Sequence, residues 1–350
     1  MSAGFAPLPL PYTAPELERR LGADWSGLLW TAYRWMRTAR SLDERMVALQ
    51  RQGRVGFYGP ATGQEAVSIA AGLAVRENDW VFPGLREQLV ALVRGHPLGS
   101  YLHHLFADSL DPASGRQMPC HPTAREVRYV SMSSCVGTQV SQAVGCAYGF
   151  RFRSDDAVSL AFFGDGATSV SDFHAGMNFA GVFHLPVVFC CTNNQWAISL
   201  PVEQQSRVAE LAEKAAAYGM PGRRVDGSDF IETYLQLSNA LETARQGRGP
   251  TLLEFVVYRM SPHSTSDDPS RYQPADWRER SAEHDPVGRM ERLLGALGLL
   301  SQDLVREMDR QIDATLREAI AAAERTAPPG PETLERDVFA PAASAPSAEG

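Results

Sequence analysis

Apolar runs of strand length alternate with helix-patterned segments through the middle of the chain. VSLAFF, LPVVFCCT and LLEFVVY are rich in β-branched and aromatic residues, and stretches with apolar residues at helical spacing separate them. Strands joined through helices pair in parallel, because the helix carries the chain back to the other end of the sheet. We therefore expect an α/β fold, with a mostly parallel sheet and helices on both of its faces.

Other patterns flank this region. Asp24 precedes a long amphipathic helical pattern that stops at Gly53, whereas the segment after Tyr258 has no period and is rich in Ser, Asp and Pro. The expected divisions are a helical arm and loop over 1–62, an α/β domain over 63–258, a loop over 259–283, C-terminal helices over 284–326 and a disordered tail over 327–350.

Composition excludes several classes of protein. The net charge is −8 and no long basic run occurs, so we expect no nucleic-acid partner. The five cysteines form no C-x-x-C pair, and no stretch reads as a signal peptide or membrane span, so we expect a soluble, cytoplasmic protein. Lys214 is the only lysine and no G-K-[ST] is present, which excludes a P-loop. Lys214 lies in an alanine-rich helical stretch, where we expect it to be solvated.

A glycine turn follows the run VSLAFF and holds an aspartate, Asp165, between Gly164 and Gly166. Three interpretations compete. A dinucleotide fingerprint requires an acid near the end of the next strand, where Cys190, Cys191 and Thr192 stand instead. A simple turn is the second, since Asp and Gly are common turn formers. In the third, Asp165 binds a divalent cation that bridges the protein to a diphosphate.

The next strand favours the cation interpretation. LPVVFCCT ends in Asn193-Asn194, and the carboxyl ends of neighbouring parallel strands meet at one edge of a sheet. Mg²⁺ prefers oxygen ligands from one or two protein groups together with phosphate oxygens. The two strand ends therefore predict a Mg²⁺ and diphosphate site.

G-D-G followed by N-N resembles the thiamine diphosphate motif. From about Tyr33 to Leu297 the chain resembles the alpha subunit of the decarboxylating component of 2-oxo acid dehydrogenase complexes, through GRVGFYGPATGQEA, GRQMPCH, GDGA, NNQWAIS, RVDGSD and YRMSPHSTSDDPSRY. RQGRVGFY and HSTSDD resemble the branched-chain enzymes most. Pyruvate and acetoin enzymes remain alternatives, as does, from another class, a non-catalytic Rossmann-like nucleotide-binding regulator.

The resemblance implies roles for particular residues. Asp165, the Asn194 side chain and the Trp196 carbonyl would bind Mg²⁺. The residues that would contact thiamine diphosphate are Leu85, Arg86, Ser134, Val136, Asp165, Gly166, Ala167, Asn194 and His263. Phe57 and Tyr58 match a substrate-pocket segment. Ser133, Thr138 and Gln139 match a K⁺ site. The alternative is that they only form a loop and cap the helix that follows.

Two positions depart from the family pattern. Leu85 stands where relatives have a tyrosine and Thr192 where they have an arginine, so two phosphate contacts are expected to be missing. Trp196 replaces a tyrosine, a change without effect on a carbonyl ligand.

Among the histidines, His263 is the expected catalytic residue, because it lies in the aperiodic 259–283 segment, which the resemblance makes an active-site loop. His121 is a second, weaker candidate. His103, His104 and His174 are expected to be structural. Arg259, Asp267 and Tyr272 match positions that order the loop in relatives.

The implied activity is oxidative decarboxylation of a small 2-oxo acid, with acyl transfer to a lipoyl group on the acyltransferase component. An essential glutamate of this family lies on a second α/β domain that the chain lacks, which implies a beta subunit in a heterotetramer of two alpha and two beta chains. Gly137, Ser141, Gly145 and Gly149 recur every four residues. They predict a small-residue ridge, within the subunit or between subunits.

Overall fold

A five-stranded parallel sheet forms the centre of the protein, as the alternation of patterns predicts. The computed structural model describes residues 12–336 and 338. The sheet order is β1-β2-β3-β7-β6, with every neighbouring pair parallel. The strands are β1 (Trp80–Phe82), β2 (Ser159–Gly164), β3 (Val187–Asn193), β6 (Gly222–Asp226) and β7 (Thr251–Val256). A short antiparallel ribbon, β4 (Trp196–Ala197) with β5 (Leu200–Pro201), follows β3.

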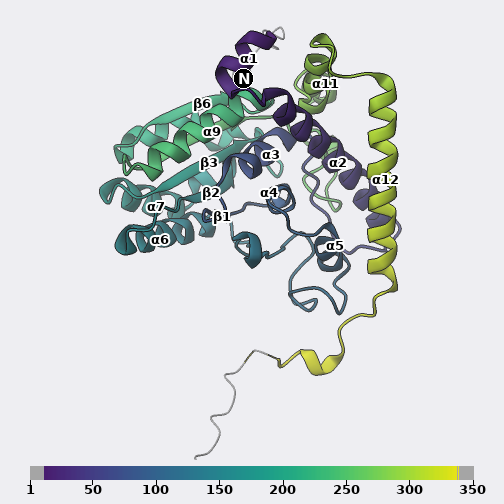
Figure 1. Ribbon diagram of the computed structural model, residues 1–350. Coiled ribbons are helices and arrows are strands. Elements are labelled where there is room, and N and C mark those ends of the chain that lie inside the picture. The colour runs from purple at the N-terminus through teal and green to yellow at the C-terminus, as the bar shows by residue number, and fades with distance from the viewer. Residues whose placement is uncertain (1–11, 337, 339–350) are drawn as a thin grey trace, which may run out of the picture.

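Each face of the sheet has its own hydrophobic core, because successive strand residues point to opposite faces. Leu160, Phe162 and Cys190 belong to one core, and Ala161 and Phe163 to the other. The first core is covered by α3 (Glu65–Ala74), α4 (Gln88–Val93) and α9 (Phe230–Arg245). The second is covered by α6 (Thr138–Arg153), α7 (Ser171–Val182) and the 3₁₀ segment η3 (Leu211–Tyr218). Figure 1 shows the sheet between α9 on one side and α6 and α7 on the other.

Terminal helices pack beside the first core. The pattern that begins after Asp24 forms α2 (Trp25–Arg51), and Gly53 follows it with a positive φ of 72°. α2 packs against α11 (Pro286–Ala296) and the long α12 (Gln302–Arg325), which also contacts α5 (Leu98–Phe106) (Figure 1). Other short elements are α1 (Ala14–Leu21), α8 (Val202–Gln205) and the 3₁₀ turns η1 (Arg125–Val127), η2 (Asp165–Ser169) and η5 (Pro331–Thr333).

The segment 259–283 is more ordered than its composition predicts. It contains the 3₁₀ turn η4 (Pro269–Arg271) and the helix α10 (Trp277–Ala282), where Trp277 packs with Trp196 and Tyr258 in a small aromatic cluster. The Ser, Asp and Pro content hides this cluster, because aromatic residues distant in the sequence form it. Of the tail predicted over 327–350, residue 337 and residues 339–350 lie outside the described residues.

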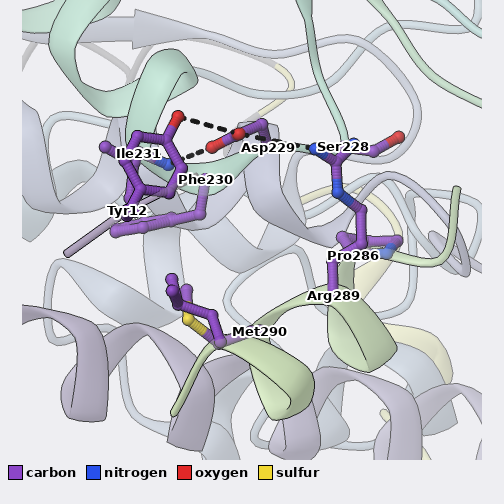
Figure 2. Close-up of a pocket in the computed structure, with 9 residues that line it drawn as sticks. Tyr12, Ser228, Asp229, Phe230, Ile231, Pro286, Arg289 and Met290 are labelled. Carbon is purple, nitrogen blue, oxygen red and sulfur yellow. Dashed lines mark hydrogen bonds and ion pairs between the residues drawn. The ribbon is translucent and has the colours of Figure 1, made fainter. Parts of the chain in front are cut away.

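The RVDGSD segment joins the sheet to the C-terminal helices. Asp229 accepts hydrogen bonds from the N–H groups of Ile231 and Glu232 and so caps α9. Arg289 of α11 pairs with Asp226 at 2.6 Å. It also pairs with Asp229 at 3.4 Å, and the Tyr12 hydroxyl donates to Asp229 at 3.0 Å (Figure 2). The adjoining cavity is only about 20 Å³, room for about one water, so we assign this motif a structural role.

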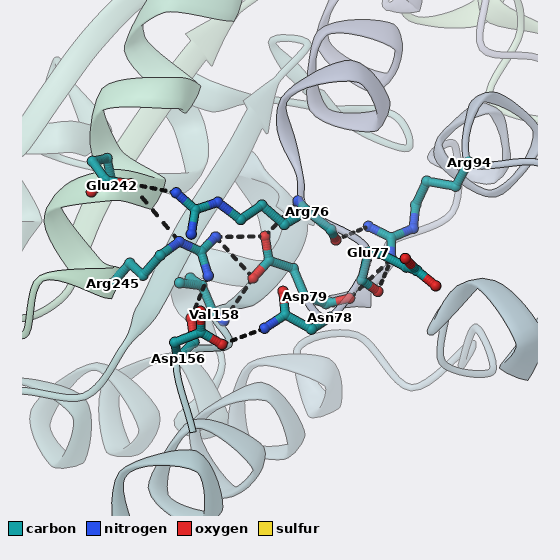
Figure 3. Close-up of polar contacts among 9 residues, drawn as sticks. All are labelled: Arg76, Glu77, Asn78, Asp79, Arg94, Asp156, Val158, Glu242 and Arg245. Carbon is teal, nitrogen blue, oxygen red and sulfur yellow. Dashed lines mark hydrogen bonds and ion pairs between the residues drawn. The ribbon is translucent and has the colours of Figure 1, made fainter. Parts of the chain in front are cut away.

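A buried ion pair closes the amino-terminal edge of the sheet. Both Asp79 carboxylate oxygens accept from Arg245 at 2.8 and 3.0 Å, and they also accept from the Arg76 and Val158 N–H groups (Figure 3). Asp79 is fully buried. The carboxylate thereby ties α9, β2 and the turn before β1 together.

Asp79→Ala should lower the free energy of unfolding by about 3–5 kcal/mol, because it leaves the Arg245 guanidinium buried and two N–H groups without an acceptor. Urea unfolding followed by circular dichroism measures this change. Glu242→Ala is the control, because Glu242 pairs with Arg76 in an exposed position worth at most about 1 kcal/mol. Equal losses in the two variants would contradict the assignment.

Among the described residues, no helix is both long and apolar enough to cross a bilayer. All five cysteines are free.

Candidate functional site

A cavity of about 480 Å³ opens at the carboxyl edge of the sheet, where β2 and β3 end. Its walls come from segments far apart in the sequence. The predicted site residues that line it are Phe57, Leu85, Arg86, His121, Ser133, Ser134, Val136, Gln139, Asp165, Gly166, Ala167, Thr192, Asn194, Trp196 and His263. The fold therefore brings together nearly all of the side chains that the motifs single out.

Asp165 lies at the first turn after β2 and is 2% exposed. Its Oδ2 atom is buried and has no hydrogen-bond partner. Burial raises the pKa of Asp165 to about 7, although the N–H groups of Asp165 and Asn194 act in the opposite direction. A buried carboxylate oxygen without a partner is costly unless something binds it, so this atom is a ready ligand for a cation.

Asn194 provides a second oxygen beside Asp165. Its Nδ2 group donates to Gln64 Oε1 at 3.2 Å, which fixes the amide so that Oδ1 faces the Trp196 N–H group. The Trp196 carbonyl, the third predicted ligand, accepts from Arg259 at 3.3 Å. Because a carbonyl has two lone pairs, this long bond leaves it able to bind a cation.

The loop of residues 165–169 presents backbone to the cavity. A Cβ atom added at Gly166 would lie 2.9 Å from the Ala197 Cβ, so a larger residue would displace the β4–β5 ribbon. Gln205 donates to the Gly166 carbonyl at 2.8 Å and so anchors the loop from the outside. Gly166 and Ala167 both line the cavity, where N–H groups of a tight turn can bind an anion.

His263 reaches the cavity from the 259–283 segment, and Arg86 lies beside it. Arg86 Nη2 donates to the His263 carbonyl at 2.7 Å and lies 3.3 Å from His263 Nδ1. A guanidinium has no acceptor, so Nδ1 accepts and the neutral ring carries its proton on Nε2. Burial, with the charges of Arg86 and Arg259, lowers the pKa of His263 to about 4. His263 is therefore a neutral hydrogen-bond donor at physiological pH.

The residues predicted to order this segment do contact one another. Asp267 accepts from the His263 N–H group at 2.8 Å and from the Tyr272 hydroxyl at 2.5 Å. Arg259 is fully buried and donates to the same hydroxyl at 2.7 Å. This chain of bonds fixes the position of His263.

His121 also lines the cavity and contacts Ser134. Its Nδ1 atom is 3.1 Å from the Pro119 carbonyl, which can only accept. In the neutral ring Nε2 is therefore the acceptor, and Ser134 donates to it at 2.5 Å. The lone pairs of Ser134 are then free to accept from a ligand in the cavity.

Several predicted residues have other surroundings. Tyr58 does not line the cavity, because its side chain is fully buried and its hydroxyl donates to Asp43 at 2.7 Å. Thr138 donates to the Cys135 carbonyl at 2.6 Å, outside the cavity, whereas Gln139 has a buried Oε1 atom without a partner. The three histidines expected to be structural have partners outside the cavity: His103 pairs with Asp108, His104 with Asp111, and His174 with Tyr218.

The sequence interpretation of Lys214 is wrong. Its side chain is half-buried, and Nζ donates to Thr168 beside the Asp165 turn. The alanine-rich segment forms a 3₁₀ helix against the sheet rather than a solvated α-helix.

Sequence analysis also missed Glu87 and Gln64. Both are buried and line the cavity, and Glu87 accepts from the Arg86 N–H group and the Thr192 hydroxyl. Gln64 stands in the motif GRVGFYGPATGQEA and Glu87 directly follows Arg86, but only the folded chain shows that both side chains line the cavity.

The donor set fits Mg²⁺ and a diphosphate. Among the described residues no group of three or more His, Cys, Asp or Glu side chains could hold a metal ion. The unpartnered Asp165 oxygen, the Asn194 amide oxygen and the Trp196 carbonyl are hard oxygen ligands of the kind that Mg²⁺ prefers.

Comparisons with known proteins identify the family of the chain. A family described as "Dehydrogenase E1 component" matches residues 33–332. The chain is 42% identical to 3-methyl-2-oxobutanoate dehydrogenase subunit alpha of Mycobacterium tuberculosis, covering 91% of this chain and 86% of that protein. It is 40% identical to 2-oxoisovalerate dehydrogenase subunit alpha of Bacillus subtilis, over 88% and 94%. Identity to pyruvate dehydrogenase E1 component subunit alpha of Bacillus cereus is 37%, over 82% and 75%.

Proposed function

The chain belongs to the dehydrogenase E1 component family, and we propose that it is the thiamine-diphosphate-binding alpha subunit of a branched-chain 2-oxo acid dehydrogenase. The Mycobacterium tuberculosis and Bacillus subtilis relatives, named for 3-methyl-2-oxobutanoate and 2-oxoisovalerate, are 42% and 40% identical to the chain, against 37% for the relative named for pyruvate. The observation that carries the proposal is the buried, unpartnered Asp165 oxygen in the large cavity where β2 and β3 end.

In this proposal Asp165, Asn194 and the Trp196 carbonyl bind Mg²⁺, and Gly166, Ala167 and Arg86 bind the diphosphate. Leu85 and Thr192 add no charge to that site. Ser134 and Val136 border the organic part of the cofactor. The unpartnered Gln139 oxygen, with Ser133 and Thr138, would bind K⁺.

When bound, thiamine diphosphate supplies the carbon nucleophile and accepts the electron pair that remains when CO₂ leaves a 2-oxo acid. The chain's own groups orient and stabilise the reactants. Arg86 and the turn at Gly166 place positive charge and N–H groups against the diphosphate. His263 would offer its Nε2–H group to oxygen at the reacting centre, and Phe57 adds an apolar side chain to the wall of the cavity. The fragment left after decarboxylation would be oxidised by the disulfide of a lipoyl group on the acyltransferase component, which would be reduced to a dithiol that carries the acyl group as a thioester.

The cavity requires a second chain to close it. Val136, Ile198 and Met118 border it with 60%, 55% and 45% of their surface exposed. Exposed apolar groups around a pocket are typical of an interface. We propose that a beta subunit covers this edge and supplies the catalytic glutamate. Two alpha and two beta chains would form the assembly.

A second exposed surface lies on α6 and α7. Tyr148, Phe179 and Phe183 form an exposed aromatic cluster with ring centroids 4.6–5.7 Å apart. Gly145 and Gly149 lie beside it with no atom within 4 Å of an added Cβ. Gly137 differs, because a Cβ there would meet Val170 at 2.3 Å within the chain. Of the predicted small-residue ridge, Gly145 and Gly149 are therefore the positions available to a partner.

The proposed function is tested with the purified chain alone and with its beta partner. Decarboxylation of 2-oxoisovalerate, pyruvate and 2-oxoglutarate is measured with Mg²⁺ and thiamine diphosphate present. We expect no turnover by the isolated chain, and turnover with a preference for 2-oxoisovalerate after the beta subunit is added. Cofactor-dependent decarboxylation by the isolated chain, or no activity in the complex, would contradict the proposal.

Gly145→Leu should prevent assembly with the beta subunit while leaving the isolated chain folded, because a side chain there separates surfaces that approach closely. Analytical ultracentrifugation measures the assembly. Gly295→Leu is the matched control. Gly295 is likewise an exposed helix glycine, on α11, and a Cβ added there would have no atom within 4 Å. Normal assembly of the Gly145 variant would exclude α6 from the interface.

A further inference from the structure

The segment η3 is connected by hydrogen bonds to both loops that carry the predicted cation ligands, the loop after β2 and the loop after β3. It packs against β6, β7 and α7. The fully buried Glu254 of β7 accepts from the Ala212 N–H group of η3 at 2.9 Å, and its other oxygen accepts from Asn193 Nδ2 at 2.7 Å. One carboxylate thus joins η3 to the end of β3, one residue before Asn194.

Lys214 makes the corresponding connection to the loop after β2. Its Nζ donates to the Thr168 hydroxyl at 2.8 Å and to the Thr168 carbonyl at 3.2 Å. Thr168 is 1% exposed, and its hydroxyl donates in turn to the Asp165 carbonyl at 2.9 Å. An ammonium has no acceptor, so it directs the hydroxyl proton of Thr168 toward Asp165. The three residues form one continuous chain of hydrogen bonds.

This placement of an ammonium is unusual for an alanine-rich segment. A lysine there could extend into water, yet Lys214 lies over the Phe173 ring, 5.9 Å from its centroid, and loses part of its hydration. That loss lowers the pKa of Lys214. Both hydrogen bonds of Nζ that partly offset the cost go to Thr168, on the loop that carries Asp165.

We propose that Lys214 is a positioning residue for the cation and diphosphate site. By holding Thr168, it fixes the main chain of residues 165–169 so that the Asp165 carboxylate and the Gly166 and Ala167 N–H groups face the cavity. This inference rests on the proposed function, because it assigns Lys214 to the binding of Mg²⁺ and thiamine diphosphate.

Lys214→Met tests the inference, since it keeps the length of the side chain and removes the charged donor. Calorimetry on the assembled alpha and beta chains should show affinity for Mg²⁺ with thiamine diphosphate lowered about tenfold or more, the effect of losing a hydrogen bond to a charged group. The Tm of the protein without cofactor should change little. Glu213→Gln, an exposed change on the same segment, should leave the affinity unaltered.

Thr168→Val removes the hydroxyl that connects Lys214 to Asp165. If the two residues act through one contact, the double variant should lose no more affinity than the more affected single variant. Because Lys214 is the only lysine in the sequence, ε-¹³C-lysine labelling of the alpha chain gives one side-chain signal. That signal should shift when Mg²⁺ and thiamine diphosphate are added to the complex with an unlabelled beta subunit.

The outcomes separate this inference from the proposed function. Failure of the unsubstituted complex to bind the cofactor would overturn both. Cofactor binding with equal affinity in the Lys214→Met variant would overturn the inference alone, whether or not Tm falls, because a residue that acts only on stability would give that result.

Discussion

Asp165→Ala is expected to weaken Mg²⁺-dependent binding of thiamine diphosphate by at least about 10²-fold and to abolish turnover. The carboxylate is the only charged member of the proposed ligand set, and without it only neutral oxygens, the Asn194 amide and the Trp196 carbonyl, would hold Mg²⁺. Titration calorimetry with and without Mg²⁺ on the alpha and beta complex measures the loss. Asp165→Asn should fall close to Asp165→Ala if charge is the decisive property.

The same substitution should not destabilise the chain. Burial raises the pKa of Asp165 to about 7, so its ionised form opposes folding of the unloaded protein. This opposition grows as pH rises from the ordinary carboxyl pKa to about 7. Above pH 7 the free energy of unfolding of Asp165→Ala should therefore equal or exceed that of the natural chain. Asp303→Asn, on the exposed face of α12, is the control for a lost carboxylate. Undiminished cofactor affinity in Asp165→Ala would exclude this residue as a metal ligand.

His263→Ala is expected to lower kcat about 10²-fold or more, with a smaller effect on cofactor affinity. The Nε2–H group of the neutral ring is a hydrogen-bond donor placed for the reacting centre, and removing one such donor costs about 10²–10³-fold in kcat. The contact from Arg86 to the His263 carbonyl involves main chain and persists in the variant, so the segment should keep its conformation. Steady-state kinetics with the complex, varying the 2-oxo acid, measures the change.

Two further variants identify what His263 does. His263→Gln retains an N–H donor but cannot exchange a proton readily, so substantial activity in it would indicate hydrogen bonding rather than proton transfer. Ser266→Ala, an exposed change on the same segment, should retain full activity. Unchanged kcat in His263→Ala would leave this histidine with a structural role only.

The fold and the centre of the site could be predicted because their signals are local. The strands β2 and β3 are continuous apolar runs, and the G-D-G and N-N motifs follow them directly, so parallel pairing places Asp165 and Asn194 at one edge. The long helix after Asp24 follows from its period and its glycine stop. These features depend on residues near one another in the chain.

What could not be predicted depends on contacts between distant residues. Tyr58 is adjacent to Phe57 in the sequence, yet its hydroxyl turns to Asp43 of α2, away from the cavity. Lys214 reaches a partner 46 residues away, and its alanine-rich neighbours indicate only a helix. Glu254 does signal one distant contact in the sequence, because a charged residue inside a buried run such as LLEFVVY requires a polar partner. That partner, Asn193, is 61 residues distant.

The aromatic surface on α6 and α7 affects how cells can make this protein. In an unassembled chain Tyr148, Phe179 and Phe183 are available to any other apolar surface. Phe152, which is 83% exposed, adds to them. Chains with such surfaces aggregate or are removed by chaperones and proteases. Synthesis of this chain in excess of its partner should therefore yield degraded or insoluble material, so that the scarcer subunit sets the amount of enzyme.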